Sequence, residues 1–152
     1  MRKWLGAMFV WSLAMAGAGS PLVPPDLAAV RAEPNLEKRS QLALANAEAV
    51  YKTAREAYDN GNIDQTQAAI NEILESVELA HTSLVQTGKD PRKSPKWFKK
   101  AELQTRDLVR KIESFQEQMS FSDRPMLDKV KARTQQIHDE LLLGLMEGKR
   151  KK

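Results

Sequence analysis

Small and apolar residues recur at alternating spacings of three and four along four long stretches of this chain. In the first two stretches they are Leu36, Ser40, Ala43, Ala47, Val50, Ala54 and Ala57, and then Thr66, Ile70, Ile73, Val77, Ala80 and Leu84. In the last two they are Phe98, Ala101, Thr105, Leu108, Ile112, Phe115 and Met119, and then Leu127, Val130, Thr134, Ile137, Leu141 and Gly144. Such spacing places each set, here called a seam, on one face of an α-helix. The pattern therefore predicts four amphipathic helices.

Residues that stop and start helices stand between the first two seams. The cluster from Asp59 to Asn62 is a turn in which Gly61 takes a left-handed conformation. Asp64 with Gln67 three residues later is a variant of the capping box, which begins a helix. These signals predict helices over about 36–59 and 64–87.

Similar signals bound the last two helices. Ser94 followed by Pro95 is a helix cap with proline at the first helical position. After a break at 120–125, either Ser122 or Asp123 caps the fourth helix, with Pro125 in its first turn. The predicted ranges are about 95–119 and 123–147.

Amphipathic helices of this length bury their seams only by packing together, and short connections favour antiparallel neighbours. The predicted fold class is all-α, an antiparallel up-down-up-down four-helix bundle built from two helical hairpins in sequence order. It covers residues 35–148 and is followed by a basic tail at 149–152. The linker from Gly88 to Ser94 is the longest and most polar, so hairpins that stay apart, or that close on a second chain, are the alternative.

The N-terminus has the order of a secretory signal peptide. A basic start at 1–3 precedes a charge-free apolar stretch at 4–16 and small residues with two Ala-x-Ala cleavage sites. We expect a signal peptide at 1–18, a mature chain that begins between Gly17 and Ser20, and an exported protein that is periplasmic or secreted. The alternative is an uncleaved membrane anchor. Residues 19–34, rich in Pro and Ala, predict a flexible leader in which Pro24-Pro25-Asp26 starts at most one short helix.

Composition excludes several classes of protein. The 152 residues include no Cys, so disulfides, Cys-based metal sites and a lipoprotein anchor are all excluded. The 24 Lys and Arg exceed the 20 Asp and Glu by four, and only by two once Arg2 and Lys3 leave with the signal peptide. Bulk charge therefore gives no reason to predict nucleic-acid binding.

One pair of residues has the spacing of a metal-binding motif. Glu78 and His81 resemble half of the ligand set of ferritin-like di-iron proteins, but Gln135 stands where a second Glu would precede His138. At about 100° per residue, Glu78 points to water and His81 lies at the boundary of the core. We therefore predict no metal and no cofactor. The chain also lacks a nucleophile elbow, a metalloprotease motif and a phosphate-binding loop, so we predict that it is not an enzyme.

The hairpin from Val50 to Leu84 resembles one tetratricopeptide repeat. The matching residues are Ala54, Ala57, Tyr58, Gly61, Ile70 and Ile73. Val50 stands where that repeat usually has Trp and Thr66 where it has Ala, and no second copy follows. The resemblance implies a protein-binding scaffold, whereas the alternative is that any tight helical hairpin needs such small and turn residues.

Charge is distributed unevenly between the middle helices. Residues 62–88 contain four acids and no cation, whereas residues 89–111 contain nine cations and three acids. One interpretation is that the acidic second helix lies along the basic third and fixes its register. The other is that a basic end of the bundle meets an anionic surface.

The cations gather around an aromatic pair at the start of the third helix. The candidate anionic-surface site consists of Arg92, Lys93, Lys96, Trp97, Lys99 and Lys100. Cations are unfavourable at a helix N-terminus, where the dipole is already positive, so stability does not explain them. Phe98 lies on the seam, which places Trp97 at the rim with its indole partly exposed.

These observations predict a non-catalytic interaction or structural module of the cell envelope, with a protein partner or self-association. The alternative is a binder of anionic envelope material, such as phospholipid, lipopolysaccharide or acidic wall polymer, through the basic Trp97 segment. We expect no nucleic-acid partner, because export removes the usual target and aromatic residues are few.

Overall fold

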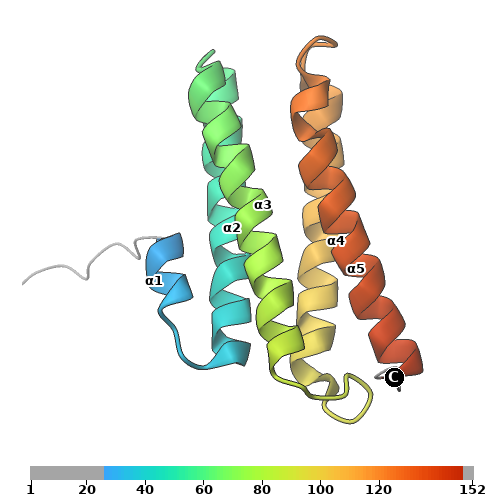
Figure 1. The fold of residues 1–152 in the computed structure, drawn as a ribbon. Coiled ribbons are helices and arrows are strands. Elements are labelled where there is room, and N and C mark those ends of the chain that lie inside the picture. The colour runs from blue at the N-terminus through green and yellow to red at the C-terminus, as the bar shows by residue number, and fades with distance from the viewer. Residues whose placement is uncertain (1–25, 149–152) are drawn as a thin grey trace, which may run out of the picture.

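The computed structural model describes residues 26–148. They form a short helix, α1 (Leu27–Arg31), and four long helices, α2 (Leu36–Asp59), α3 (Ile63–Gln86), α4 (Pro95–Gln118) and α5 (Asp128–Glu147). A 3₁₀ turn, η1 (Arg124–Leu127), precedes the last helix (Figure 1). The long helices pack together into a helical bundle, as the seams predict. The predicted signal peptide, the first part of the leader and the basic tail lie outside the described residues.

The start of α3 differs from its prediction. Asn62 occupies the N-cap and accepts a 3.0 Å hydrogen bond from the backbone N–H of Gln65. The capping box expected at Asp64 is wrong, because Asp64 already lies in the first helical turn. Gly61, with φ of 74°, has the left-handed conformation that the turn requires.

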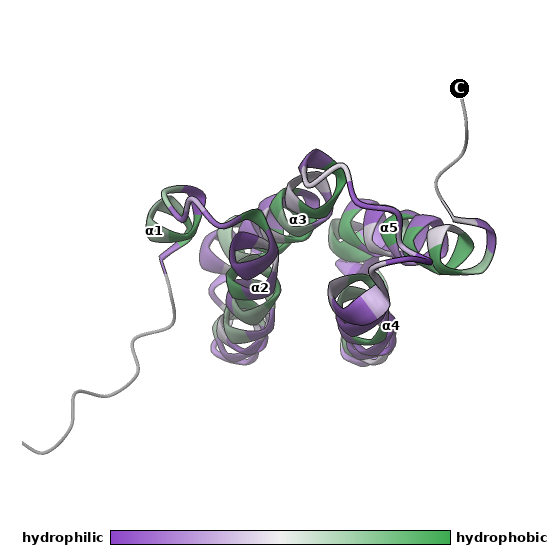
Figure 2. Cartoon of the chain, turned by 90° about the horizontal axis from the view of Figure 1, so that it is seen from below, coloured by the Kyte–Doolittle hydropathy of each residue, from purple (hydrophilic) through white to green (hydrophobic). Residues whose placement is uncertain are grey.

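The helices pair as two antiparallel hairpins, α2 with α3 and α4 with α5 (Figure 1). Viewed along the bundle, α3 lies beside α5 and α2 lies beside α4, and the helices of each such pair run in the same direction (Figure 2). The expected packing in sequence order is therefore wrong at its middle step, since α3 and α4 lie diagonally across the bundle. The linker at 87–94 is long enough for this crossing, because an extended residue spans about 3.3 Å.

One core joins the hairpins. Almost every seam residue is buried, and the buried residues of all four long helices form a single cluster. Phe115 of α4 lies edge-on to Tyr51 and Tyr58 of α2, with ring centroids 6.0 and 5.7 Å away. The Tyr51 hydroxyl also donates a 3.0 Å hydrogen bond to the carbonyl of Lys111. The alternative in which the hairpins stay apart does not describe this structure.

Part of the predicted leader is docked on the bundle. Residues 27–31 form α1, whose Leu27 and Val30 are buried and which lies against α2. Arg31 forms a 2.9 Å ion pair with Glu75 of α3. The one short helix that the sequence allows after Asp26 is therefore present. It is not flexible as the leader was expected to be, because two buried apolar side chains and an ion pair hold it against the bundle.

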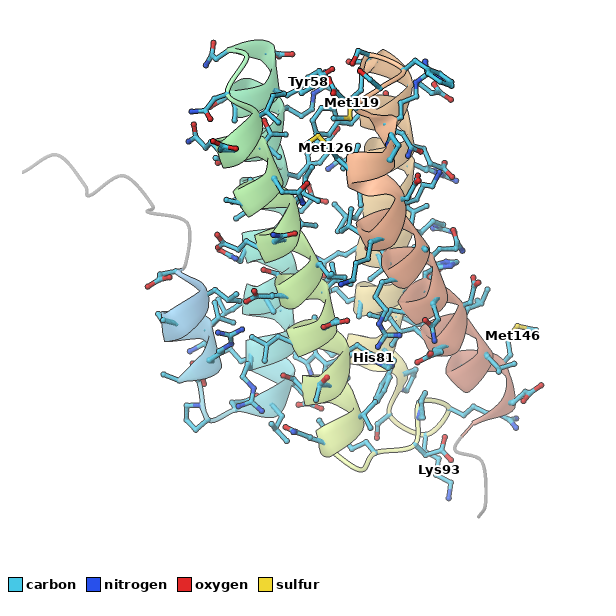
Figure 3. All side chains as sticks on the ribbon, turned by 45° about the horizontal axis from the view of Figure 1, so that its top comes forward. Tyr58, His81, Lys93, Met119, Met126 and Met146 are labelled. Carbon is cyan, nitrogen blue, oxygen red and sulfur yellow. The ribbon has the colours of Figure 1, made fainter. Side chains whose placement is uncertain are left out.

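The turn before α5 is built around Tyr58. Asp123 makes no capping hydrogen bond, contrary to one predicted option. Its carboxylate instead accepts hydrogen bonds from the hydroxyls of Tyr58 (2.9 Å) and Ser120 (2.6 Å). The backbone N–H of Ser120 donates to the Tyr58 oxygen at 2.9 Å. We call Tyr58, Ser120 and Asp123 the upper clasp, because they tie α2 to the second hairpin near Met119 and Met126 (Figure 3).

Candidate functional site

The predicted site lies at the end of the bundle where α3 and α5 finish and α2 and α4 begin, here called the lower end (Figure 1). Gly88, with φ of 67°, follows the end of α3. Asp90 then organises the linker: its side chain accepts a 2.9 Å hydrogen bond from the N–H of Arg92, and its carbonyl accepts bonds from Lys93 and Ser94. These bonds hold the linker in a defined turn. The backbone positions of the cations Arg92 and Lys93 are therefore fixed.

The six predicted residues do not share one face. Lys96, Trp97 and Lys99 line a hollow beside the start of α2, together with Glu37, Lys89, Ser94 and Pro95. Arg92 and Lys93 line a second hollow beside the end of α5, with Asp90, Glu147 and Gly148. Lys100 turns toward α2 and donates a 3.3 Å hydrogen bond to Gln41. The structure therefore brings Lys96, Trp97 and Lys99 together in one hollow, with Lys100 beside Trp97 but outside the hollow. It places Arg92 and Lys93 elsewhere on the same end.

Trp97 lies at the rim of the core. It is half-buried and packs against the buried cluster, whereas its neighbour Phe98 is fully inside. The ammonium groups of Lys96 and Lys100 lie 4.5 and 5.8 Å from the centre of its ring system. Both distances are within the range of cation–π attraction, so the indole and the two lysines form one amphipathic unit.

Several cations of the lower end have no acidic partner in the described part of the chain. Lys89 pairs with Glu37 at 2.6 Å and Lys38 pairs with Glu33 at 3.2 Å. No ion pair within residues 26–148 involves the side chains of Arg92, Lys93, Lys96 and Lys99. Cations without partners give this end of the bundle a positive field that favours anions.

The acidic helix α3 and the basic helix α4 do not form ion pairs with each other in the described part of the chain. Glu75 and Glu78 of α3 pair with Arg31 of α1 and Arg133 of α5. On α4, Lys111 pairs with Glu48 of α2. Among the described residues, no ion pair joins α3 to α4, so the interpretation of a register fixed by these two helices is wrong. Their diagonal placement in the bundle is the reason.

His81 lies between the two hairpins (Figure 3). Its Nε2 is 3.1 Å from the carboxylate of Glu140 on α5, which Arg133 also approaches. Burial lowers the pKa of His81, Glu140 opposes that effect and Arg133 adds to it. Glu78 is exposed and bound to Arg133, as the helical geometry predicts for an outward residue. No group of three or more residues suited to hold a metal occurs within 26–148.

Sequence reasoning missed a second histidine contact. His138 Nε2 lies 3.0 Å from the Glu102 carboxylate, and both side chains are largely buried between α4 and α5. The two residues stand 36 positions apart on different helices, so no local pattern connects them.

Sequence reasoning also missed an apolar groove at the lower end. Its lining residues are Leu84, Val85, Gly88, Lys89, Pro91, Phe98, Gly144 and Gly148. Val85 is 61% exposed, and Met146 on the nearby end of α5 is 69% exposed. A Cβ on Gly144 would lie 3.2 Å from the Pro91 ring, so glycine lets the linker approach α5 closely. The lining comes from the end of α3, the linker, the start of α4 and the end of α5, so no local sequence pattern marks the groove.

No protein-family model matches the chain, and no curated protein matches it significantly. No helix within residues 26–148 is long and apolar enough to cross a membrane.

Proposed function

We propose that this chain is an exported, non-catalytic interaction module of the cell envelope, and that the lower end of its bundle is the binding surface. One observation carries the proposal: an apolar groove lies there beside cations that have no acidic partner in the described residues. Apolar contact supplies affinity at such a surface, and unpaired charge supplies orientation and specificity. The exposed Val85 and Met146 add apolar area at the same end.

The proposal that the protein is exported is based on the order of basic, apolar and small residues at positions 1–20. Mass spectrometry of the native protein should show a chain that begins between Gly17 and Ser20. An intact Met1 in a membrane fraction would instead identify an uncleaved anchor and overturn the cleavage.

The binding surface can be tested by photo-crosslinking in intact cells. A photoreactive side chain at Val85 should yield crosslinked adducts, because this position lines the groove and is 61% exposed. The same side chain at Gln136, exposed higher on α5, is the matched control and should yield none. Equal yields at the two positions, or no adduct at either, contradict a binding surface at the lower end.

A second candidate function is binding of anionic envelope material through Trp97 and its lysines. It is favoured by the half-buried indole under Lys96 and by the hollow that Lys96 and Lys99 line with it. After signal cleavage Trp97 is the only tryptophan, so its fluorescence should shift on titration with phosphatidylglycerol vesicles at low salt. Replacing Lys96 and Lys99 by Gln should remove the shift, whereas Lys129→Gln at the opposite end should preserve it. A shift that survives the double substitution or high salt counts against this function.

The tetratricopeptide interpretation has less support. Helices α2 and α3 have 24 residues each, so the hairpin exceeds the roughly 34 residues of that repeat. Contacts with α4 and α5 also occupy the inner side of the hairpin. A protein partner therefore has better access at the lower end than inside this hairpin.

A further inference from the structure

The apolar groove has the dimensions of a socket for one side chain. Its volume is about 220 Å³, below the roughly 300–1,000 Å³ that small-molecule pockets usually have. Leu84, Val85, Pro91 and Phe98 supply apolar walls, and Lys89 lies at its edge. A concave apolar site of this size fits one inserted side chain. It is poorly suited to a flat membrane surface, because membrane-binding proteins insert protruding groups into the lipid.

A matching side chain projects from the opposite end of the bundle, here called the upper end. Phe121 is 86% exposed, and it is the one exposed aromatic residue within 26–148. The upper clasp holds its turn: Ser120, next to it, is bonded through both its backbone N–H and its hydroxyl. The guanidinium of Arg124 lies 6.0 Å from the ring. The ring is therefore held outward by a hydrogen-bonded turn.

Phe121 cannot reach the groove of its own chain. It follows α4, whereas the groove lies at the level where α4 begins. The 24 residues of α4 separate the two sites by about 36 Å, at roughly 1.5 Å per residue. Within residues 26–148 no exposed aromatic side chain lies at the groove, so among the described parts of the molecule only a second copy can supply one.

The charges of the two ends are complementary. The upper end exposes the carboxylates of Asp59, Asp64, Glu117 and Asp128, against the cations Arg124 and Lys129. The groove is bordered by Lys89, and Arg92 and Lys93 follow its Pro91 wall along the linker. Approach of an upper end to a lower end is therefore electrostatically favourable, whereas two lower ends repel each other.

We propose that the groove at the lower end receives Phe121 from a second copy of this chain, so that copies associate head to tail. This inference rests on the proposed function, since it names the partner of the same binding surface. A contact between two different surfaces leaves a free groove at one end and a free Phe121 at the other, so it propagates into open chains or closes into rings.

Sedimentation velocity of the native protein over a range of concentrations tests the association. At low salt we expect reversible species larger than a dimer, and we expect them to dissociate as the ionic strength rises. Phe121→Ser and Val85→Glu should each raise the concentration needed for association about tenfold or more. Both positions are exposed, so the fold should tolerate these changes. Ile63→Ser, also exposed at the upper end, is the matched control and should associate like the unaltered chain.

Mixing the two variants gives the decisive result. The Phe121→Ser chain keeps its groove and the Val85→Glu chain keeps its Phe121, so the mixture should form a one-to-one dimer that cannot grow. A mixture that stays monomeric, or a Phe121→Ser chain that still associates, overturns the head-to-tail contact. If the unaltered chain is monomeric but a photoreactive side chain at Val85 still crosslinks to another protein or to lipid, this inference fails and the proposed function stands. If that side chain yields no adduct in cells, the proposed function fails independently.

Discussion

The hydroxyl of Tyr58 lies 2.9 Å from the carboxylate of Asp123, 65 positions further along the chain. This contact joins the last turn of α2 to the turn that precedes α5, so it crosses from one hairpin to the other. His81 and Glu140 make the corresponding contact nearer the lower end. Polar pairs of this kind add specificity to an apolar interface, because only one alignment of the hairpins satisfies both.

Tyr58→Phe tests the upper clasp. The substitution keeps the ring beside Phe115 but removes the hydroxyl that binds Asp123 and the backbone of Ser120. We expect the free energy of unfolding to fall by about 1 kcal/mol, as measured by urea denaturation. Thr53→Val, exposed on the same helix, is the control. If both variants match the unaltered chain, the clasp does not stabilise the fold.

His81 should make stability depend on pH. Burial lowers its pKa in the folded chain, so the unfolded chain, with a pKa near 6.5, binds the proton first. The free energy of unfolding should therefore decrease as the pH falls below about 6.5, until the pH passes the folded pKa. In His81→Gln this part of the decrease should be absent, whereas Thr82→Ala, exposed beside it, should retain it. Urea denaturation at pH 7.5 and pH 5 measures the difference. An unchanged pH dependence in His81→Gln would show that another group causes it.

Ile112 tests the shared core. Its side chain is 0% exposed and belongs to the buried cluster that both hairpins form. Ile112→Ala should lower the free energy of unfolding by roughly 2–5 kcal/mol, and Ile73→Ala and Leu108→Ala should have effects in the same range. Leu103→Ala, at an exposed position of α4, should change it by about half a kcal/mol or less. Similar losses at Ile112 and Leu103 would contradict the observed packing.

The start of α3 can be assigned by comparing two substitutions. Asn62→Ala removes the capping hydrogen bond to Gln65 and should cost about 1 kcal/mol of stability in thermal or urea unfolding. Asn60→Ala, exposed in the same turn, should have little effect. If Asp64→Ala lowers the free energy of unfolding more than Asn62→Ala does, the helix begins at the predicted capping box of Asp64.

The sequence by itself determined the helices and their buried faces. A helix repeats every 3.6 residues, so the spacing of residues such as Ile70, Ile73 and Val77 places them on one face, whichever helix packs against that face. Turn glycines such as Gly61 mark helix ends for an equally local reason, because few other residues adopt a positive φ. Trp97 could be placed at the rim from the same angles.

Only the tertiary structure decided which helices are neighbours. A seam records that a face is buried but not what covers it, so the sequence pattern could not show that α3 lies beside α5 and diagonal to α4. That arrangement brings His81 to Glu140 and forms the groove between Val85 and Gly144. It also divides five of the six predicted site residues between two hollows and leaves Lys100 outside both. Contacts between residues far apart in the chain depend on the packing of whole helices, and that packing leaves no periodic signal in any one segment.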